Sequence, residues 1–95
     1  MFEKIEDITI TYEEDGVVLV KEIDKEILSK GAWTTIVFKY KQWDPKTKEY
    51  GDDKYSIRRY KKQNGEFSQK SKFNISNKEQ AVKIIECLNK WVELS

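Results

Sequence analysis

The sequence contains no histidine, one cysteine, one proline and four glycines among its 95 residues. Histidine is the side chain that most often serves as general base, proton shuttle and metal ligand near neutral pH. The single cysteine, Cys87, cannot form an intramolecular disulfide, and its place at an apolar stripe predicts a small buried side chain rather than a nucleophile. There is also no glycine-rich phosphate loop. The sequence therefore predicts a protein that is not an enzyme and that uses neither a cofactor nor a metal.

Long apolar runs are absent as well, and none approaches the roughly 20 residues that a membrane-spanning helix requires. The first seven residues are acidic and lack the apolar centre of a signal peptide. We therefore expect a soluble cytoplasmic protein with no membrane partner. The length is close to that of the commonest domains, which predicts one domain over residues 1–95.

Charge is abundant but unevenly distributed. Charged residues make up 37% of the chain and apolar residues 38%, with a net charge of +1. Residues 1–30 hold nine acidic and four basic side chains, whereas residues 31–74 hold eleven basic and five acidic ones. This predicts one acidic and one basic surface, which either complement each other or serve a partner such as a phosphate backbone. Because a chain this small buries a modest share of its surface, we also expect a homodimer.

The N-terminal part reads as an acidic hairpin over residues 8–28. Ile8, Ile10 and Tyr12 alternate with threonines, a pattern typical of a strand. Asp15-Gly16 predicts a type I′ turn, because both central residues of that turn need positive φ. Residues 21–28 fit either a continued strand or a short helix, and we favour the strand because a compact loop then leads to the next one.

A basic sheet over residues 32–75 and a helix over residues 77–93 follow. Strands are expected near residues 33–43, 55–62 and 67–75, with Asn64-Gly65 as a hairpin turn. Ser76 and Glu79 fit a capping box at the start of the helix. The apolar helix stripe consists of Ala81, Ile84, Ile85, Leu88, Trp91 and Val92. We expect it to pack on the sheet face formed by Ile36, Phe38, Ile57, Phe67 and Phe73. The fold class is α+β: a curved antiparallel sheet of four to five strands, with one C-terminal helix packed on one face.

The other face of this sheet is the candidate binding site. Residues 54–72 contain seven basic side chains and one acid, Glu66. We expect one face to carry cations and aromatic rings together: Lys39, Lys41, Arg58, Lys62, Lys70 and Lys72, with Trp33, Trp43 and Tyr60 among them. Cations follow a phosphate backbone while aromatic rings stack on unpaired bases, so this pattern predicts binding of single-stranded DNA or RNA. The alternative is a solvated face whose lysines prevent edge-to-edge aggregation.

Two acidic clusters allow other functions. Glu13-Glu14-Asp15 and Asp52-Asp53 could form a metal site or an acid–base pair, but both flank turns, where acids are common. The acidic hairpin or an exposed edge strand would also suit a protein–protein interaction module.

A family resemblance joins these observations. Tyr55-Ser56-Ile57-Arg58-Arg59-Tyr60, Asn64-Gly65-Glu66, Phe73-Asn74-Ile75-Ser76 and Glu79-Gln80 resemble the core of the positive-cofactor-four family. These are transcriptional coactivator-like proteins that bind single-stranded DNA, and Pur-alpha repeats share their plan. The resemblance covers about residues 54–80 and implies a dimer of ββββα units that holds a single strand across a curved sheet. It marks Arg58 and Tyr60 as contacts, and the acidic first 30 residues lie outside it.

Overall fold

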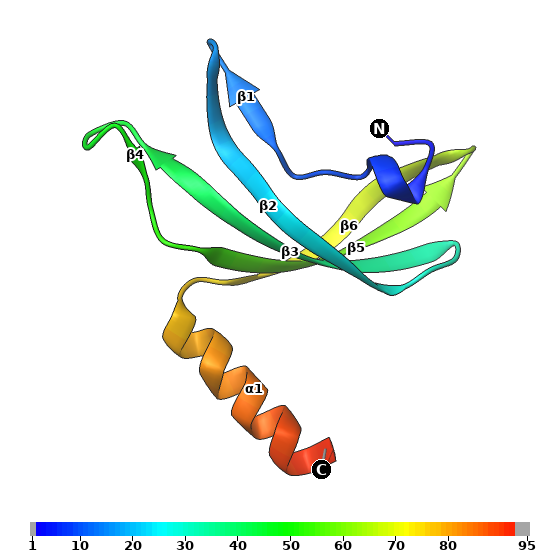
Figure 1. Cartoon of the computed structure of the whole chain (residues 1–95). Coiled ribbons are helices and arrows are strands. Elements are labelled where there is room, and N and C mark those ends of the chain that lie inside the picture. Colours follow the sequence, from blue (N-terminus) through cyan, green and yellow to red (C-terminus); the bar gives the residue numbers. More distant parts are fainter. Residues whose placement is uncertain (1, 93–95) are drawn as a thin grey trace.

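A curled antiparallel sheet followed by one helix forms the fold, which confirms the α+β class (Figure 1). The computed structural model describes residues 2–92. A short 3₁₀ turn, η1, spans Ile5–Asp7. The strands and the helix are β1 (Tyr12–Glu14), β2 (Val17–Ser29), β3 (Trp33–Asp44), β4 (Glu49–Tyr50), β5 (Lys54–Gln63), β6 (Glu66–Ile75) and α1 (Lys78–Val92). The order across the sheet is β1-β2-β3-β5-β6, and the short β4 pairs with the end of β3.

Both predicted hairpin turns are present. Asp15 and Gly16 have φ of +51° and +80°, and Asn64 and Gly65 have φ of +53° and +80°. Two consecutive positive φ values are the signature of the type I′ turn, whose twist matches that of the flanking strands.

Strand β2 is long and irregular. Residues 21–28 continue it, as the strand interpretation predicted. Ile23 and Leu28 are extra residues in its pairing with β3, and they are 41% and 60% exposed. Such bulges leave the extra residue without a partner on the neighbouring strand. They explain why two large apolar side chains face water here.

The register between β3 and β5 decides which side chains share a face. Ile36 lies opposite Arg58, and Val37 lies opposite Ile57. Residues directly opposite each other in an antiparallel pair project from the same face. The inner face therefore carries Thr34, Ile36, Phe38 and Tyr40 of β3 with Lys54, Ser56, Arg58, Tyr60 and Lys62 of β5. The outer face carries Trp33, Thr35, Val37, Lys39, Lys41 and Trp43 with Tyr55, Ile57, Arg59 and Lys61.

The apolar sheet face predicted from the sequence is wrong, because it combines residues that project from opposite faces. Ile36 and Phe38 are inner residues, whereas Ile57 is an outer one. A register shift of one residue exchanges the faces of a whole strand, and the strand sequences alone do not fix it. Strand β6 adds a second reason: Lys70 is an extra residue in its pairing with β5, so Phe67 projects inward and Phe73 outward.

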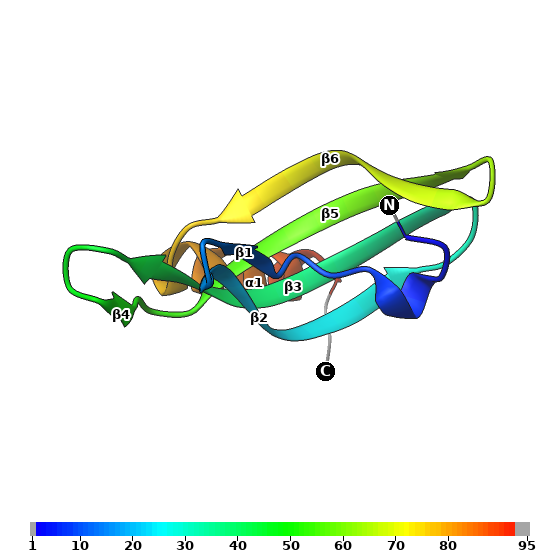
Figure 2. The same cartoon turned by 90° about the horizontal axis from the view of Figure 1, so that it is seen from above.

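The inner face is covered by the first residues of the chain. Residues 2–11, which we call the N-terminal strap, lie within the curl of the sheet (Figures 1 and 2). Ile8 and Ile10 are 0% and 7% exposed and belong to the core, with Ile36, Phe38, Tyr40, Tyr60 and Phe67. The strand predicted over residues 8–12 is therefore wrong in position: β1 begins at Tyr12, because Ile8 and Ile10 pack onto the sheet face instead of extending the hairpin.

The helix begins one residue later than the capping-box pattern implied. Asn77 Oδ1 accepts a hydrogen bond from the Gln80 N–H at 2.8 Å, and Gln80 Oε1 accepts one from the Ser76 N–H at 2.9 Å. Asn77 is thus the N-cap, and Gln80 rather than Glu79 reaches back. The helix predicted over residues 77–93 is observed over Lys78–Val92; Glu93 lies outside the described residues.

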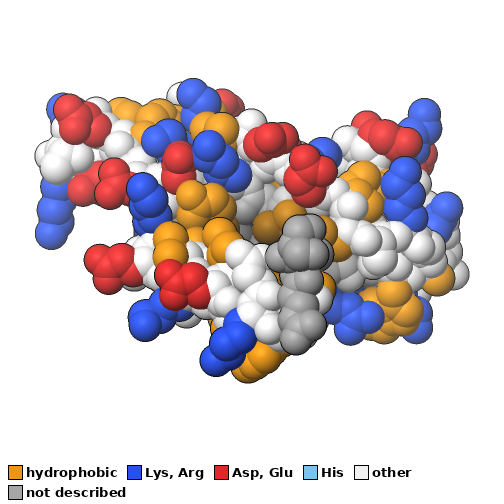
Figure 3. Space-filling model, turned by 60° about the horizontal axis from the view of Figure 1, so that its bottom comes forward, with side chains coloured by type: hydrophobic (Ala, Val, Ile, Leu, Met, Phe, Trp, Pro, Cys, Tyr) orange, Lys and Arg blue, Asp and Glu red, His pale blue; other side chains and the backbone are white. Residues whose placement is uncertain are grey.

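The helix extends from the outer side of the sheet and has few contacts with it, mainly with β6. None of its described residues is buried. Figure 3, which views the molecule with the bottom of Figure 1 brought forward, shows hydrophobic side chains at the surface among charged ones. The packing of the helix on a sheet face therefore stays a prediction. Within residues 2–92, no helix is long and apolar enough to cross a membrane.

Candidate nucleic-acid interface

The register divides the nine predicted site residues between the two faces. Outer residues are Trp33, Lys39, Lys41 and Trp43, and inner residues are Arg58, Tyr60, Lys62 and Lys72. Lys70 is the unpaired residue of the β6 bulge. The expectation that all nine share one face is wrong, because it depended on a β3–β5 register shifted by one residue.

Arg58 is the centre of the inner group. Its Nε donates to Ser56 Oγ at 3.1 Å and its Nη1 donates to Gln69 Oε1 at 3.1 Å. Ser56 Oγ in turn donates to Asn74 Oδ1 at 2.7 Å. Lys72 lies directly opposite Arg58 on β6. Among the described residues, Arg58 and Lys72 form no ion pair with a carboxylate. Neutral oxygens thus orient the guanidinium, and no described carboxylate lies within ion-pair distance of it.

Tyr60 is on the same face but is only 2% exposed. Burial raises the pKa of its phenol, and the nearby Arg58 partly opposes this shift. Lys62, the next inner residue, holds its ammonium 5.5 Å from the centre of the Phe67 ring. The strap therefore closes the aromatic part of the inner face, while Arg58 and Lys62 remain accessible beside it.

A second cationic cluster surrounds Trp33 on the outer face. The Arg59 guanidinium lies 4.5 Å from the Trp33 ring centre, and the Lys61 ammonium lies 5.1 Å from it. Trp33 is 41% exposed. Sequence reasoning missed both partners, because only the pairing of Trp33 with Lys61 brings the three side chains together.

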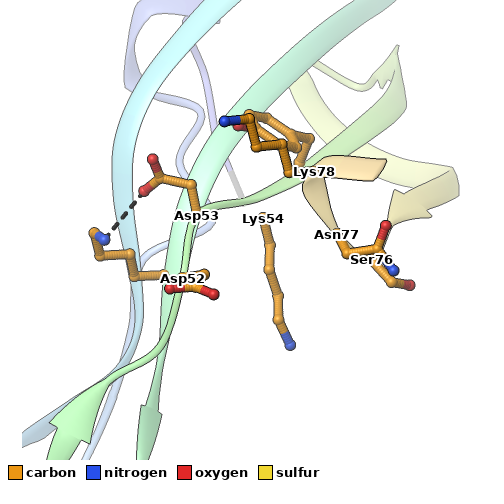
Figure 4. A pocket seen from close by; sticks show the side chains of 8 residues that line it. Asp52, Asp53, Lys54, Ser76, Asn77 and Lys78 are labelled. Carbon is orange, nitrogen blue, oxygen red and sulfur yellow. Dashed lines mark ion pairs between the residues drawn. The ribbon is translucent and has the colours of Figure 1, made fainter. Parts of the chain in front are cut away.

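The other outer residues of the prediction have partners within the chain. Lys41 and Lys39 approach the Asp53 carboxylate at 3.2 and 3.5 Å, and Figure 4 shows an ion pair of Asp53. The Lys41 ammonium is the main cause that lowers the pKa of Asp53. Trp43 packs edge-on against Tyr50 with ring centres 5.1 Å apart. Lys39 and Lys41 thus link β3 to the residue before β5, and Trp43 links β3 to β4.

An open hollow of about 630 Å³ lies where the helix leaves the sheet (Figure 4). Asp52, Asp53, Lys54, Ser76 and Lys78 help to line it. A carboxylate whose pKa is lowered is a weak base and holds no proton to donate near neutral pH. In the part of the chain that the structure describes, no three His, Cys, Asp or Glu side chains gather as metal ligands. Asp53 is here the ion-pair partner of two lysines.

Cys87 lies half-buried on the helix, and its thiol donates to the Ile84 carbonyl at 3.3 Å. The acidic cluster at the tip of the β1–β2 hairpin, Glu13 to Asp15, is exposed. No family model, curated protein or solved structure matches the chain.

Proposed function

We propose that the chain is a non-catalytic module that binds single-stranded DNA or RNA on the inner face of its sheet, as the resemblance to the positive-cofactor-four family implies. The observation that carries this proposal is the Arg58–Lys72 pair. These two cations are direct cross-strand neighbours without a carboxylate partner among residues 2–92.

The chemistry of this pair suits a phosphate. A guanidinium presents several N–H donors in one plane and binds phosphate oxygens in a bidentate way. Hydrogen bonds from Arg58 to Ser56 and Gln69 restrict its side chain before a ligand arrives, so less conformational entropy is lost on binding. A flexible single strand can follow a curled sheet, whereas a duplex is better read by a helix or ribbon in its major groove.

The number of cations sets the expected salt dependence. Arg58, Lys62, Lys70 and Lys72 are the four predicted contacts on or beside the inner face of β5 and β6, where Lys54 is a further cation that donates to Gln42 Oε1. If all four neutralise phosphates, the logarithm of the binding constant should fall with the logarithm of salt concentration at a slope of about −3. Fluorescence anisotropy with labelled single-stranded and duplex oligonucleotides, over a salt series, measures this slope and the preference for single strands.

Adjacent arginines provide a matched pair of variants. Arg58 and Arg59 follow each other on β5 but project from opposite faces. Arg58→Gln should weaken binding by about tenfold, because a hydrogen bond to a charged group is lost. Arg59→Gln should leave the affinity nearly unchanged. If Arg59→Gln weakened binding and Arg58→Gln did not, the site would instead lie on the outer face, where Arg59 and Lys61 surround Trp33. If the wild type binds no oligonucleotide even at low salt, the proposal fails and a protein partner for the acidic hairpin or an edge strand takes its place.

We also propose that the chain forms a homodimer in which each helix packs on the outer sheet face of the other copy. A row across the outer face joins Val37, Ile57 and Phe73. The helix stripe exposes Ile85, Leu88 and Trp91 to 57%, 50% and 71%. One copy thus has an apolar sheet face and an apolar helix stripe that could pack together, but both are exposed to water. Exchange of helices about a two-fold axis would cover both.

The available area is sufficient for a specific contact. Five side chains are at least half exposed on these surfaces: Phe73, Ile85, Leu88, Trp91 and Val92. At roughly 100 Å² each, they supply roughly 1,000 Å² for the pair, near the lower limit of biological interfaces, and neighbouring polar groups add to this.

Sedimentation or light scattering tests the dimer directly. We expect a dimer mass for the wild type, a monomer for Leu88→Glu, and a dimer for the control Lys83→Glu, whose side chain lies away from the stripe. A monomer mass of the wild type at high concentration would refute the proposal.

A further inference from the structure

The N-terminal strap lies directly beside the proposed nucleic-acid site and covers its aromatic part. We propose that the strap is a displaceable cover, which a single strand must lift to reach the aromatic rings of the inner face. This inference rests on the proposed function and adds a regulation of the same site.

The strap is held differently from the strands of the sheet. Between Phe2 and Thr11 its only ladder-like pairing is one isolated bridge, from Phe2 to Phe67. The other polar attachments come from β2: the Glu22 N–H donates to the Thr11 hydroxyl at 3.2 Å, and two β2 side chains supply the rest. Glu22 Oε1 accepts from the Thr9 hydroxyl at 2.8 Å and from the Ile10 N–H at 3.2 Å, and the Lys25 ammonium donates to main-chain carbonyls of the strap. A segment without a continuous ladder can open without the sheet separating.

Beneath the strap lies a surface with the composition of a single-strand platform. Phe38, Tyr40, Tyr60 and Phe67 are 0–4% exposed and belong to one cluster with Ile8 and Ile10. Arg58 and Lys62 adjoin these rings on the same face of β5. Stacking of bases on aromatic rings, with cations beside them on the phosphates, is the common mode of single-strand binding. Bases would replace Ile8 and Ile10 as the apolar partner of the rings.

The net negative charge of the strap disfavours the approach of a nucleic acid to the inner face. Glu3, Glu6 and Asp7 are exposed carboxylates, and Lys4 is the only base in the segment. With the strap in place, an approaching phosphate meets these acids beside the inner-face cations. Lifting the strap removes the acids and frees the Lys25 ammonium, so the open state favours phosphate and the closed state disfavours it.

In this proposal the strap and a single strand compete for the inner face, and this competition changes the measured affinity. If only the open state binds fully, the apparent affinity is reduced by the fraction of molecules in that state. A variant that weakens the closed strap should therefore bind more tightly. Thr9→Ala removes the partly buried hydrogen bond to Glu22 and the acceptor of the exposed Thr11 N–H, and it should tighten binding about fivefold. Thr47→Ala, the same change in the exposed β3–β4 turn, is the control and should have no effect.

The experiment combines anisotropy with hydrogen exchange on the full chain, using a 20-nucleotide oligothymidylate as the probe. At saturating probe, the amides of Ile10 and Phe67, which the closed strap protects, should exchange several-fold faster. Binding with unchanged or slower exchange at residues 2–11, or a Thr9→Ala affinity no tighter than that of Thr47→Ala, would overturn the cover while leaving the proposed function intact. A lack of binding by anisotropy would overturn both.

Discussion

Replacement of Ile8 by alanine tests whether the strap is part of the hydrophobic core. Ile8 is 0% exposed and contacts the aromatic cluster of the inner face. The change removes buried methyl and methylene groups and leaves a cavity, which costs about 3 kcal/mol of unfolding free energy for an isoleucine in a packed core. For a domain of this size, each 1 kcal/mol lowers the melting temperature by about 4–8 °C. We therefore expect a fall of about 12–24 °C, a large share of the stability of a small domain.

Urea and thermal unfolding followed by circular dichroism measure this loss. The matched control is Ile23→Ala, since Ile23 is an extra residue of the β2 bulge and is 41% exposed. The control should lose less than about 1 kcal/mol, because much of its side chain already faces water. Equal losses for the two variants, or an unchanged midpoint for Ile8→Ala, would refute the placement of the strap against the sheet.

Two further predictions concern local contacts. Lysines lower the pKa of Asp53 from its ordinary value of 3.8. The ionised carboxylate therefore stabilises the native state at pH values above 3.8. This contribution to the free energy of unfolding disappears as the pH falls through the lowered pKa. Urea midpoints between pH 7 and pH 2 should therefore fall less steeply for Asp53→Asn than for the wild type; parallel curves would contradict this. At the start of the helix, Asn77→Ala should cost about 1 kcal/mol and Ser76→Ala much less, since Asn77 Oδ1 caps the Gln80 N–H. A larger loss for Ser76→Ala in chemical denaturation would restore the original capping-box assignment.

Local signals in the sequence predicted local structure well. The Asp15-Gly16 and Asn64-Gly65 turns, the long β2 and the helix all depend on neighbouring residues, such as positive φ at a glycine or a repeat of apolar side chains. The fold class followed from these elements. The short β4 was missed, because its two residues lie within a polar loop that carries no strand pattern.

Relations between distant segments could not be predicted in the same way. Whether Val37 or Ile36 lies opposite Ile57 is a matter of register, and both choices give an alternating pattern within each strand. The same uncertainty affected the candidate site. Arg58 and Lys72 were correctly predicted to share a face, whereas Lys39 and Trp33 were wrongly predicted to lie on that face with them. The inward packing of Ile8 and Ile10 depends on space above the sheet, which the alternation of the segment does not reveal.

The bulge at Lys70 gives β6 a constraint on its length. This one extra residue reverses the face from which each later side chain of β6 projects. Phe67 therefore supplies a ring to the inner core, and Phe73 supplies one to the outer row. Deletion of Lys70, or insertion of one residue beside it, would make the ladder regular or shift it, and one of the two rings would then project from the wrong side. The β3–β4 turn, by contrast, is exposed and can change length without moving a core side chain. Among sequences that share this fold, gaps are therefore expected near residues 45–48 and not between residues 67 and 73.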